Sequence, residues 1–224
     1  MGITFKGITS DSLDVRVNVL PNIIKPQRRS EIILINGKDG ADVVENGFAP
    51  YILKCKIMVT DLTKLDTVVA WLDGTGVLIT PDDPLKQRYV RVLNQVDYAK
   101  LMNWKETEVE FYCYDPFRYL ITDANFTLLA GGNVTNAGTY KSEPLIKLTG
   151  SGYVTVTING RDFTYNFDTP YVYIDSKIKE AYHLTDLKNR QLGGDFPILD
   201  VGVNAISWVG TVTEMVITKR TRYL

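Results

Sequence analysis

The side chains best suited to nucleophilic or metal-dependent chemistry in this sequence are its one histidine, His183, and its two cysteines, Cys55 and Cys113. A Ser/His or Cys/His pair would have to use His183, but the surrounding segment 180–184 contains no nucleophile motif. A zinc site needs three or four ligands at short spacings, and these three residues are scattered along the chain. We therefore expect no catalytic residue and no metal site, and a packed or surface position for His183.

Glycines and carboxylates could form two other kinds of site. The glycines at 74–76 follow a predicted helix instead of opening one, so their amides cannot hold a phosphate at a helix N-terminus, and the sequence has no P-loop motif. We expect no cofactor. Paired carboxylates can hydrolyse glycosides, but the sequence does not show which of Asp82, Asp83, Asp195 and Asp200 lie close together in space. A hydrolase is the least supported alternative, and we expect the chain not to be an enzyme.

Composition excludes several further classes of protein. The 224 residues include 25 Lys and Arg against 26 Asp and Glu, so neither sign dominates and we expect no sequence-specific binding of nucleic acid. A hydrophobic content of 45% is enough to bury a core. The longest apolar run, 68–72, is far shorter than the roughly 20 residues that a bilayer requires, and we expect no membrane insertion. The start of the chain shows no secretion signal, and we expect synthesis in a reducing cytoplasm with both cysteines buried as free thiols.

Alternating apolar residues dominate the first half of the chain. Segments 13–19, 53–59 and 109–113 each place apolar side chains at every second position, the pattern of half-buried strands. Segment 31–35 differs, because it is apolar on both faces and runs into a glycine-rich turn at 36–40. These patterns predict a mainly β fold.

One stretch has a helical period. Apolar residues recur at helical spacing between Asp61 and Asp73, Asp61 can cap the N-terminus, and Gly74 follows where helices often end. The spacing predicts one helix of about 12 residues lying on a sheet. Trp71 lies off the centre of the apolar stripe, so it either packs under a neighbouring strand of its own domain or faces a partner.

The second half of the chain has the pattern of a small β-sandwich. Asn159-Gly160 separates two alternating runs and predicts a tight hairpin, and further strand patterns follow at short intervals. The stretch 130–139 is the loosest in the chain. We therefore predict two domains, 1–130 and 131–224. Trp208 lies within a strand pattern, where we expect it to be buried.

Several short sequence segments along the chain have the order and spacing found in one family of phage proteins. They are Asn36–Gly40 after an apolar strand, Trp71–Leu78 followed by Pro81–Pro84, Val109–Phe117, Asn136–Thr139 leading to Ser142–Pro144, Gly150–Gly152 before the hairpin, and Phe196–Leu199 with Gly202–Trp208. Taken together over nearly all 224 residues, the sequence resembles the distal tail (Dit) proteins of long-tailed bacteriophages and prophages.

This resemblance implies a fold, an assembly and a place in the virion. The implied fold is an N-terminal β-rich domain with one helix, which forms a hexameric ring, and a C-terminal galectin-like β-sandwich. The implied function is structural: the ring joins the tail tube to the tail-tip hub, so the expected partners are other copies of the chain, the tube protein and the hub protein. The expected location is the virion tail tip, and DNA passes through the ring.

A closed ring requires two unlike patches on each copy, because one patch meets a different patch on the next copy. Phe48, Tyr51 and Trp71 are large side chains beside turns or off the helical stripe, and they are our candidates for the assembly interface. Each is equally compatible with a place in the core. The open edge of a sheet can also be extended by a neighbour's strand.

A second function from another class remains open. The predicted sandwich and 13 tyrosines are also compatible with a carbohydrate-binding module that attaches to the host surface. Such a site needs an exposed aromatic ring beside a polar cluster, and the expected burial of Trp208 favours the assembly function.

Overall fold

The computed structural model describes residues 2–93 and 98–224 and divides the chain into two compact units. Unit 1 is Met1–Arg118 with Leu224, and unit 2 is Tyr119–Tyr223. The division comes earlier than the predicted boundary at residue 130. It does so because β11 (Phe126–Leu128) pairs with β19 (Gly202–Thr218) and therefore belongs to the second sheet.

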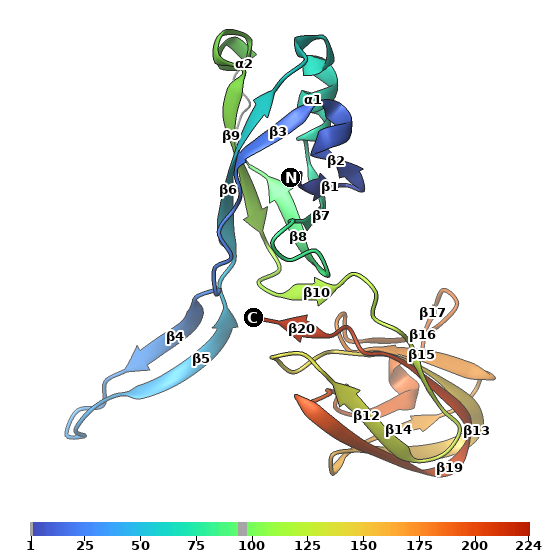
Figure 1. Ribbon diagram of the computed structural model, residues 1–224. Helices are drawn as coiled ribbons and strands as arrows, with labels where there is room; N and C mark the ends of the chain where they lie inside the picture. Colours follow the sequence, from blue (N-terminus) through green and yellow to red (C-terminus); the bar gives the residue numbers. More distant parts are fainter. Residues whose placement is uncertain (1, 94–97) are drawn as a thin grey trace. The chain divides into compact units, whose positions relative to one another are not determined.

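Unit 1 is built on an antiparallel sheet in the order β2-β1-β7-β8-β9-β6-β3 (Figure 1). Its strands are β1 (Thr4–Phe5), β2 (Ile8–Thr9), β3 (Val15–Val19), β6 (Tyr51–Val59), β7 (Thr75–Ile79), β8 (Lys86–Val92) and β9 (Glu106–Cys113). Two short strands, β10 (Arg118–Leu120) and β20 (Arg222–Tyr223), pair with each other.

The alternation predicted for the central strands is confirmed. In β6, Leu53, Cys55 and Ile57 are buried while the lysines between them are exposed, and β9 buries Val109 and Phe111 opposite them. Both cysteines are free and buried, as the pattern predicted. The outward side chains of this sheet form cross-strand ion pairs, such as Lys54 with Glu110 at 2.7 Å.

The predicted helix is present and starts with a tighter turn. Asp61 caps it by accepting a hydrogen bond from the Thr63 N–H at 2.9 Å, the 3-10 turn η2 (Leu62–Lys64) follows, and α1 (Leu65–Trp71) completes it. The expectation of a single helix was wrong, because a second short helix, α2 (Tyr98–Trp104), precedes β9 and buries Leu101 in the core. Two further 3-10 turns are η1 (Ser10–Leu13) and η3 (Asn189–Gln191).

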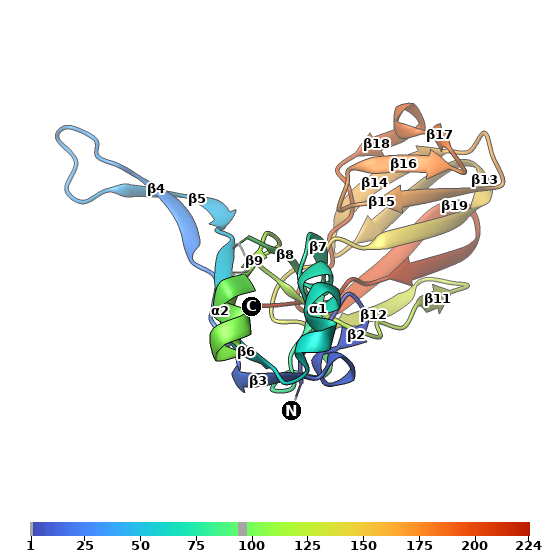
Figure 2. The ribbon, with the colours of Figure 1, turned by 90° about the horizontal axis from the view of Figure 1, so that it is seen from above.

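A separate hairpin leaves the unit 1 sheet. It consists of β4 (Arg28–Ile33) and β5 (Asp42–Phe48), which pair with each other and with no other described strand. Figures 1 and 2 both draw it as an uncovered two-stranded ribbon. We call residues 28–48 the arm.

Unit 2 is a nine-stranded antiparallel sheet that folds into two layers. Its strands besides β11 and β19 are β12 (Gly132–Asn136), β13 (Leu145–Ile158), β14 (Arg161–Asn166), β15 (Tyr171–Asp175), β16 (Glu180–His183), β17 (Asp186–Leu187) and β18 (Leu192–Gly194). The long strands β13 and β19 pair along their length, and their ends carry different neighbours: β15 and β11 at one end, β14 and β12 at the other. Side chains from both ends meet in one apolar core.

Glycines permit the bend that separates the two layers. The register between β13 and β19 shifts on both sides of Gly150 and Ser151. A Cβ at Gly150 would overlap the carbonyl oxygen of Thr211, and one at Gly210 would lie 2.6 Å from the carbonyl oxygen of Tyr153. The strands therefore approach each other here more closely than a side chain allows. The predicted Asn159-Gly160 hairpin is confirmed, with φ values of 51° and 75° at its two turn residues.

Among the described residues, no helix combines the length and the apolar character needed to cross a lipid bilayer. The mainly β fold with two regions, which the sequence predicted, is confirmed.

Candidate assembly surfaces

The most exposed apolar surface of unit 1 is on the arm. Ile32 and Val43 lie directly opposite each other across the hairpin and are 67% and 60% exposed, and Leu34 beyond the end of β4 is 79% exposed. Ile33 and Val44 are exposed as well, so apolar side chains reach solvent from both strands. A contiguous apolar patch of this kind marks an interaction site in a water-soluble protein.

The base of the arm is fixed by aromatic and ionic contacts. The Arg28 guanidinium lies 4.8 Å from the centre of the Phe48 ring, and Phe48 packs edge to face on Phe117 with ring centres 5.7 Å apart. Arg28 also forms an ion pair with Glu45 on the facing strand. The Ala49 N–H donates to the Gln27 carbonyl oxygen at 2.8 Å and closes the hairpin. These contacts hold the point where the arm leaves the sheet.

The three residues predicted for an interface lie mainly inside unit 1. Phe48 is buried at the base of the arm. Trp71 is 4% exposed, and its Nε1–H donates to the Phe5 carbonyl oxygen at 2.9 Å. Tyr51 is half-buried opposite Cys113, and burial, reinforced by Cys113 and opposed by Arg88, raises the pKa of its phenol. A role of these residues in an interface stays a prediction, and each has a packing role within its own unit.

The sequence contained a signal for the arm that our interface candidates did not use. Segment 31–35 is apolar on both faces, a pattern that usually belongs to a strand covered on both sides. In the structure, β4 and β5 pair only with each other among the described strands, and the apolar side chains of this segment are exposed.

A shallow apolar groove lies in unit 1 where the chain enters and leaves the arm. It has a volume of about 280 Å³ and is lined by Val19, Leu20, Asn22, Ile24, Ile52, Leu53 and Lys54. Val19, Ile24 and Ile52 are each more than 40% exposed. We call this the groove. It is a second apolar patch of unit 1, formed by residues other than those of the arm.

Asp83, one of the carboxylates considered for hydrolysis, is paired with cations. Asp83 is buried, and its two oxygens lie 2.9 Å from the Lys86 Nζ and 2.8 Å from an Arg118 guanidinium nitrogen. Burial alone would raise the pKa of Asp83, but the hydrogen bonds from Lys86 and Arg118 outweigh it and lower the pKa. The neighbouring Asp82 is exposed. This arrangement holds the 80–88 turn and favours the ionised form of the Asp83 carboxyl.

Unit 2 has a pocket of about 610 Å³ beside the Asn159-Gly160 hairpin. It is lined by Ile158, Arg161, Asp162, Phe163, Lys179, Asp195, Phe196, Pro197 and Ile198. The Lys179 Nζ lies 5.6 Å from the centre of the Phe196 ring, and Trp208 is half-buried against the core. Trp208 is therefore less buried than the sequence predicted, and it is not among the residues that line the pocket.

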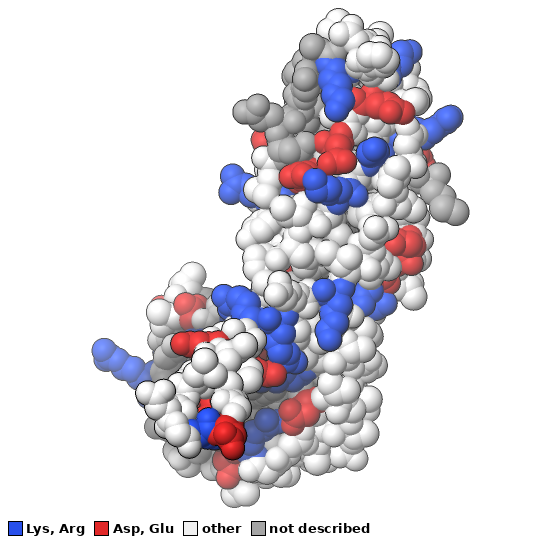
Figure 3. All heavy atoms as spheres, turned by 90° about the vertical axis from the view of Figure 1, so that its left-hand side faces the viewer, with Lys and Arg blue, Asp and Glu red and all other residues white. Residues whose placement is uncertain are grey.

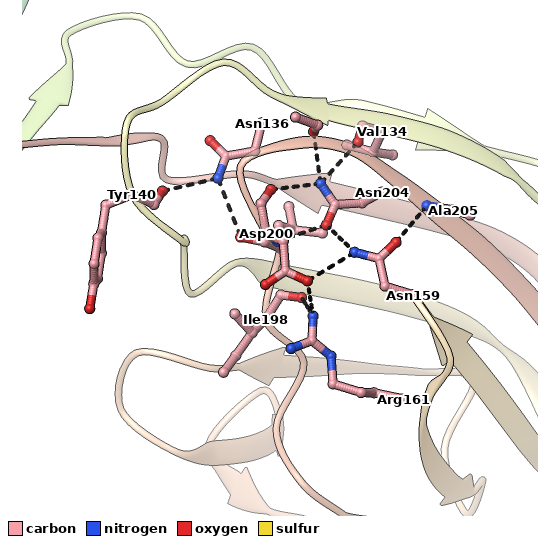
Figure 4. Close-up of polar contacts among 11 residues, drawn as sticks. Val134, Asn136, Tyr140, Asn159, Arg161, Ile198, Asp200, Asn204 and Ala205 are labelled. Atoms are coloured by element: carbon pink, nitrogen blue, oxygen red, sulfur yellow. Dashed lines mark hydrogen bonds and ion pairs between the residues drawn. The ribbon is translucent and has the colours of Figure 1, made fainter.

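A polar network ties one wall of this pocket to the hairpin (Figure 4). Asn204 is fully buried, and its amide donates to the carbonyl oxygens of Val134, Asp200 and Gly202. The Asp200 carboxylate in turn pairs with Arg161. All these groups are engaged with one another, so the network stabilises loop 198–204 and leaves no activated nucleophile.

His183 is packed, as the sequence predicted. Its ring lies 4.4 Å from the Tyr171 ring, and its Nδ1 is 2.9 Å from the Tyr171 carbonyl oxygen. Within the described ranges 2–93 and 98–224, no group of three or more His, Cys, Asp or Glu side chains is placed to hold a metal ion. On the face drawn in Figure 3, both acidic and basic side chains reach the surface.

Comparison by sequence finds no matching protein-family model and no matching curated protein. By structure, the chain is similar to the Dit protein of phage SPP1, presented as a paradigm of the hub adsorption apparatus in phages that infect Gram-positive bacteria. The identity is 16%, the TM-score is 0.72, and the similarity covers 97% of this chain and 98% of the SPP1 chain. Two structures of the phage P2 baseplate in its activated conformation, one with Ca and one with Sr, reach TM-scores of only 0.44 at 9% and 8% identity, with coverage of 92% and 90% of the two chains.

The similarity to SPP1 Dit extends from one end of the chain to the other and includes both units. The resemblance to the Dit proteins that the sequence indicated is thus confirmed at the level of the fold. The baseplate similarities are too weak to support an argument.

Proposed function

We propose that this chain is a non-enzymatic structural component of a bacteriophage or prophage tail tip, a distal tail protein whose copies form a closed ring. The ring would be hexameric and would join the tail tube to the tail-tip hub. The proposal is supported by the SPP1 Dit fold over nearly the whole of both chains, and SPP1 Dit belongs to a hub adsorption apparatus.

The observation that carries the proposal is the exposed apolar arm. A hairpin of two isolated strands is marginally stable in water, and this one also exposes Ile32, Leu34 and Val43. Covering such side chains contributes about 25 cal/mol for each Å² of apolar surface removed from water. An enzyme or a small-molecule binder has no need for such an arm, whereas an assembling subunit uses it to contact its neighbour.

The arm and the groove are two unlike patches of unit 1, as a ring requires. A six-residue strand such as β4 spans about 20 Å, so Leu34 at the far end of the arm cannot reach the groove at its own base. The arm of one copy would instead contact the groove region of the next copy. Such head-to-tail contacts give a ring when the rotation between copies closes, and the number six comes from the family resemblance.

Mass measurement in solution tests the proposal. Six copies of 25.2 kDa give a particle of about 150 kDa. We expect light scattering and native mass spectrometry to detect it, alone or after addition of the tube and hub proteins of the same phage, and negative-stain images to show rings. A chain that stays monomeric at high concentration and also in the presence of both neighbours would contradict the proposal.

A further inference from the structure

The chain contains three Asn-Gly pairs, at 36–37, 46–47 and 159–160. Glycine after asparagine leaves the following backbone nitrogen open to approach, so the pair is prone to spontaneous deamidation. Because all three sites share the Asn-Gly pair, and Asn36 and Asn159 also both follow isoleucine, a large difference between these two must come from the folded structure. We propose that Asn36, at the tip of the arm, is a site of spontaneous deamidation in the native protein, and that the fold protects Asn159.

The reaction needs only water as a co-reactant. The Gly37 nitrogen attacks the Asn36 side-chain carbon Cγ, a new C–N bond closes a five-membered succinimide, and the Cγ–Nδ2 bond breaks. Ammonia leaves with the proton that the Gly37 nitrogen loses. Water then opens the ring at either carbonyl and yields aspartate or isoaspartate at position 36. The product carries one additional negative charge.

Asn36 is free to reach the geometry that this attack requires. It lies in a turn closed by the Lys38 N–H, which donates to the Ile35 carbonyl oxygen at 3.1 Å, and Gly37 has φ +84°. Asn36 is exposed, and its side chain makes no hydrogen bond with any described residue. A Cβ placed on Gly37 would meet no atom within 4 Å, so no residue beyond its chain neighbours crowds the side of the turn where that Cβ would point. Rotation of Asn36 toward Gly37 therefore breaks no contact.

Asn159 occupies a turn of the same sequence but is held by three hydrogen bonds (Figure 4). Its Oδ1 accepts from the Ala205 N–H at 2.9 Å. Its Nδ2 donates to the Asn204 Oδ1 at 2.8 Å and to the Asp200 Oδ2 at 3.1 Å. To present Cγ to the Gly160 nitrogen, the side chain would have to break these bonds and leave the buried Asn204 without one of its partners.

The structure restrains Asn46 more than Asn36 and less than Asn159. Its carbonyl oxygen accepts a hydrogen bond from an Arg29 guanidinium nitrogen at 2.8 Å, and the pairing of β4 with β5 holds the chain on both sides of it. The ladder restricts the backbone here, whereas the tip of the arm is outside the ladder. We expect Asn46 to react more slowly than Asn36 in the native protein.

Peptide mapping by mass spectrometry tests the inference on the intact chain. The protein is incubated at mildly alkaline pH, native and in denaturant, and each Asn-Gly peptide is followed for the mass increase of about 1 Da that replacement of an amide by a carboxyl gives. In denaturant we expect all three sites to react at similar rates. In the native protein Asn36 should keep nearly its denatured rate, and Asn159 should react at least about tenfold more slowly, since its hydrogen bonds must break first.

A matched variant tests whether the early mass increase comes from Asn36. Asn36→Gln removes the reactive residue at the tip and should abolish the early mass change while the Asn159 peptide behaves as before. Native Asn159 reacting as fast as native Asn36 would overturn the inference, and so would an Asn36 that reacts only in denaturant. The native sample is the monomer separated by size exclusion, because a neighbouring copy that covers the arm in a ring would also protect Asn36.

Discussion

The ring of Phe48 lies edge to face on the ring of Phe117, with centres 5.7 Å apart and an angle of 78° between the planes. Phe48 is the last residue of β5, and the chain enters β6 three residues later. The contact therefore anchors the arm at the position where it departs from the sheet. Because no other described strand pairs with the arm, this contact at its base is the one that we expect to hold the arm in a fixed orientation on the sheet.

Replacing Phe48 with Ala should destabilise unit 1. The substitution removes a buried ring, leaves a cavity against Phe117 and ends the contact with Arg28, and buried Phe→Ala changes cost about 3 to 5 kcal/mol. Denaturant unfolding followed by fluorescence measures the difference. The control is Val43→Ala on the exposed part of the arm, which should change the free energy of unfolding by less than about 0.5 kcal/mol. Equal effects of the two variants would argue against an anchor at Phe48.

Gly150 should be irreplaceable, whereas nearby Gly152 should not be. An Ala side chain at Gly150 would overlap the Thr211 backbone, which cannot move without opening the pairing of β13 and β19, and we expect a loss of about 3 kcal/mol or more. Gly152 has φ +69° but open space around it, so Gly152→Ala should cost only the backbone strain of about 1 to 2 kcal/mol. Thermal unfolding of both variants checks the order. A Gly150→Ala variant as stable as Gly152→Ala would show that the bend does not need the close approach.

The two cysteine thiols should be inert in the native protein. Burial raises the pKa of both Cys55 and Cys113 to about 12, so the reactive thiolate is scarce at neutral pH. We expect no labelling by a thiol reagent at pH 7 in the folded chain and two labels per chain after unfolding. Fast labelling of either native thiol would mean that the β6–β9 region opens readily.

A buried ion pair should make the stability of unit 2 depend on pH in the acid range. The Asp175 oxygens lie 2.5 and 2.8 Å from two Arg220 nitrogens. Burial alone would raise the pKa of Asp175, but the hydrogen bonds from Arg220 and from the N–H groups of Lys177 and Ile178 lower it. Because the folded pKa lies below the unfolded one, the contribution is complete above the unfolded pKa, near 4, and is lost as pH falls through the folded pKa.

Asp175→Asn separates this pair from other acid-sensitive groups. At pH 7 the variant should be less stable by about 3 kcal/mol, because Arg220 loses its partner. Between about pH 5 and pH 2 the wild type should lose stability more steeply than the variant, so the two curves converge. Parallel curves over that range would contradict the assignment. Urea unfolding at a series of pH values provides the measurement.

Local patterns were sufficient to predict most of the strands. Alternation identified β6 and β9 because each has one face in a core, and Asn159-Gly160 identified its hairpin because only a few residues accept positive φ at both turn positions. The sequence shows two separate strand patterns, 204–209 and 213–218, where the structure has the one long strand β19, because the bend at Gly210 interrupts the pattern while pairing with β13 continues on both sides.

Features that depend on tertiary contacts were missed. Helix α2 has seven residues, of which Leu101 is buried, too few for a recognisable helical period. For Trp71 the sequence left two positions open, under a strand of its own domain or against a partner. Its hydrogen bond to the Phe5 carbonyl oxygen and the Phe5 ring 6.1 Å away place it in the core. The exposed arm could not be foreseen from segment 31–35 alone, because an apolar two-faced strand looks the same whether its cover comes from its own chain or from another.

A charge on the arm should prevent assembly without unfolding the subunit. Leu34→Glu places a carboxylate at the most exposed apolar position of the arm, where burial against a neighbour would leave the charge without a partner. Because Leu34 is exposed in the single chain, the free energy of unfolding should change by less than about 0.5 kcal/mol. Leu184→Glu is the matched control, since Leu184 is 71% exposed on unit 2. Light scattering should detect rings for the wild type and the control, and monomers for Leu34→Glu. Rings formed equally well by Leu34→Glu would exclude the arm as the contact between copies, whatever the function of the ring.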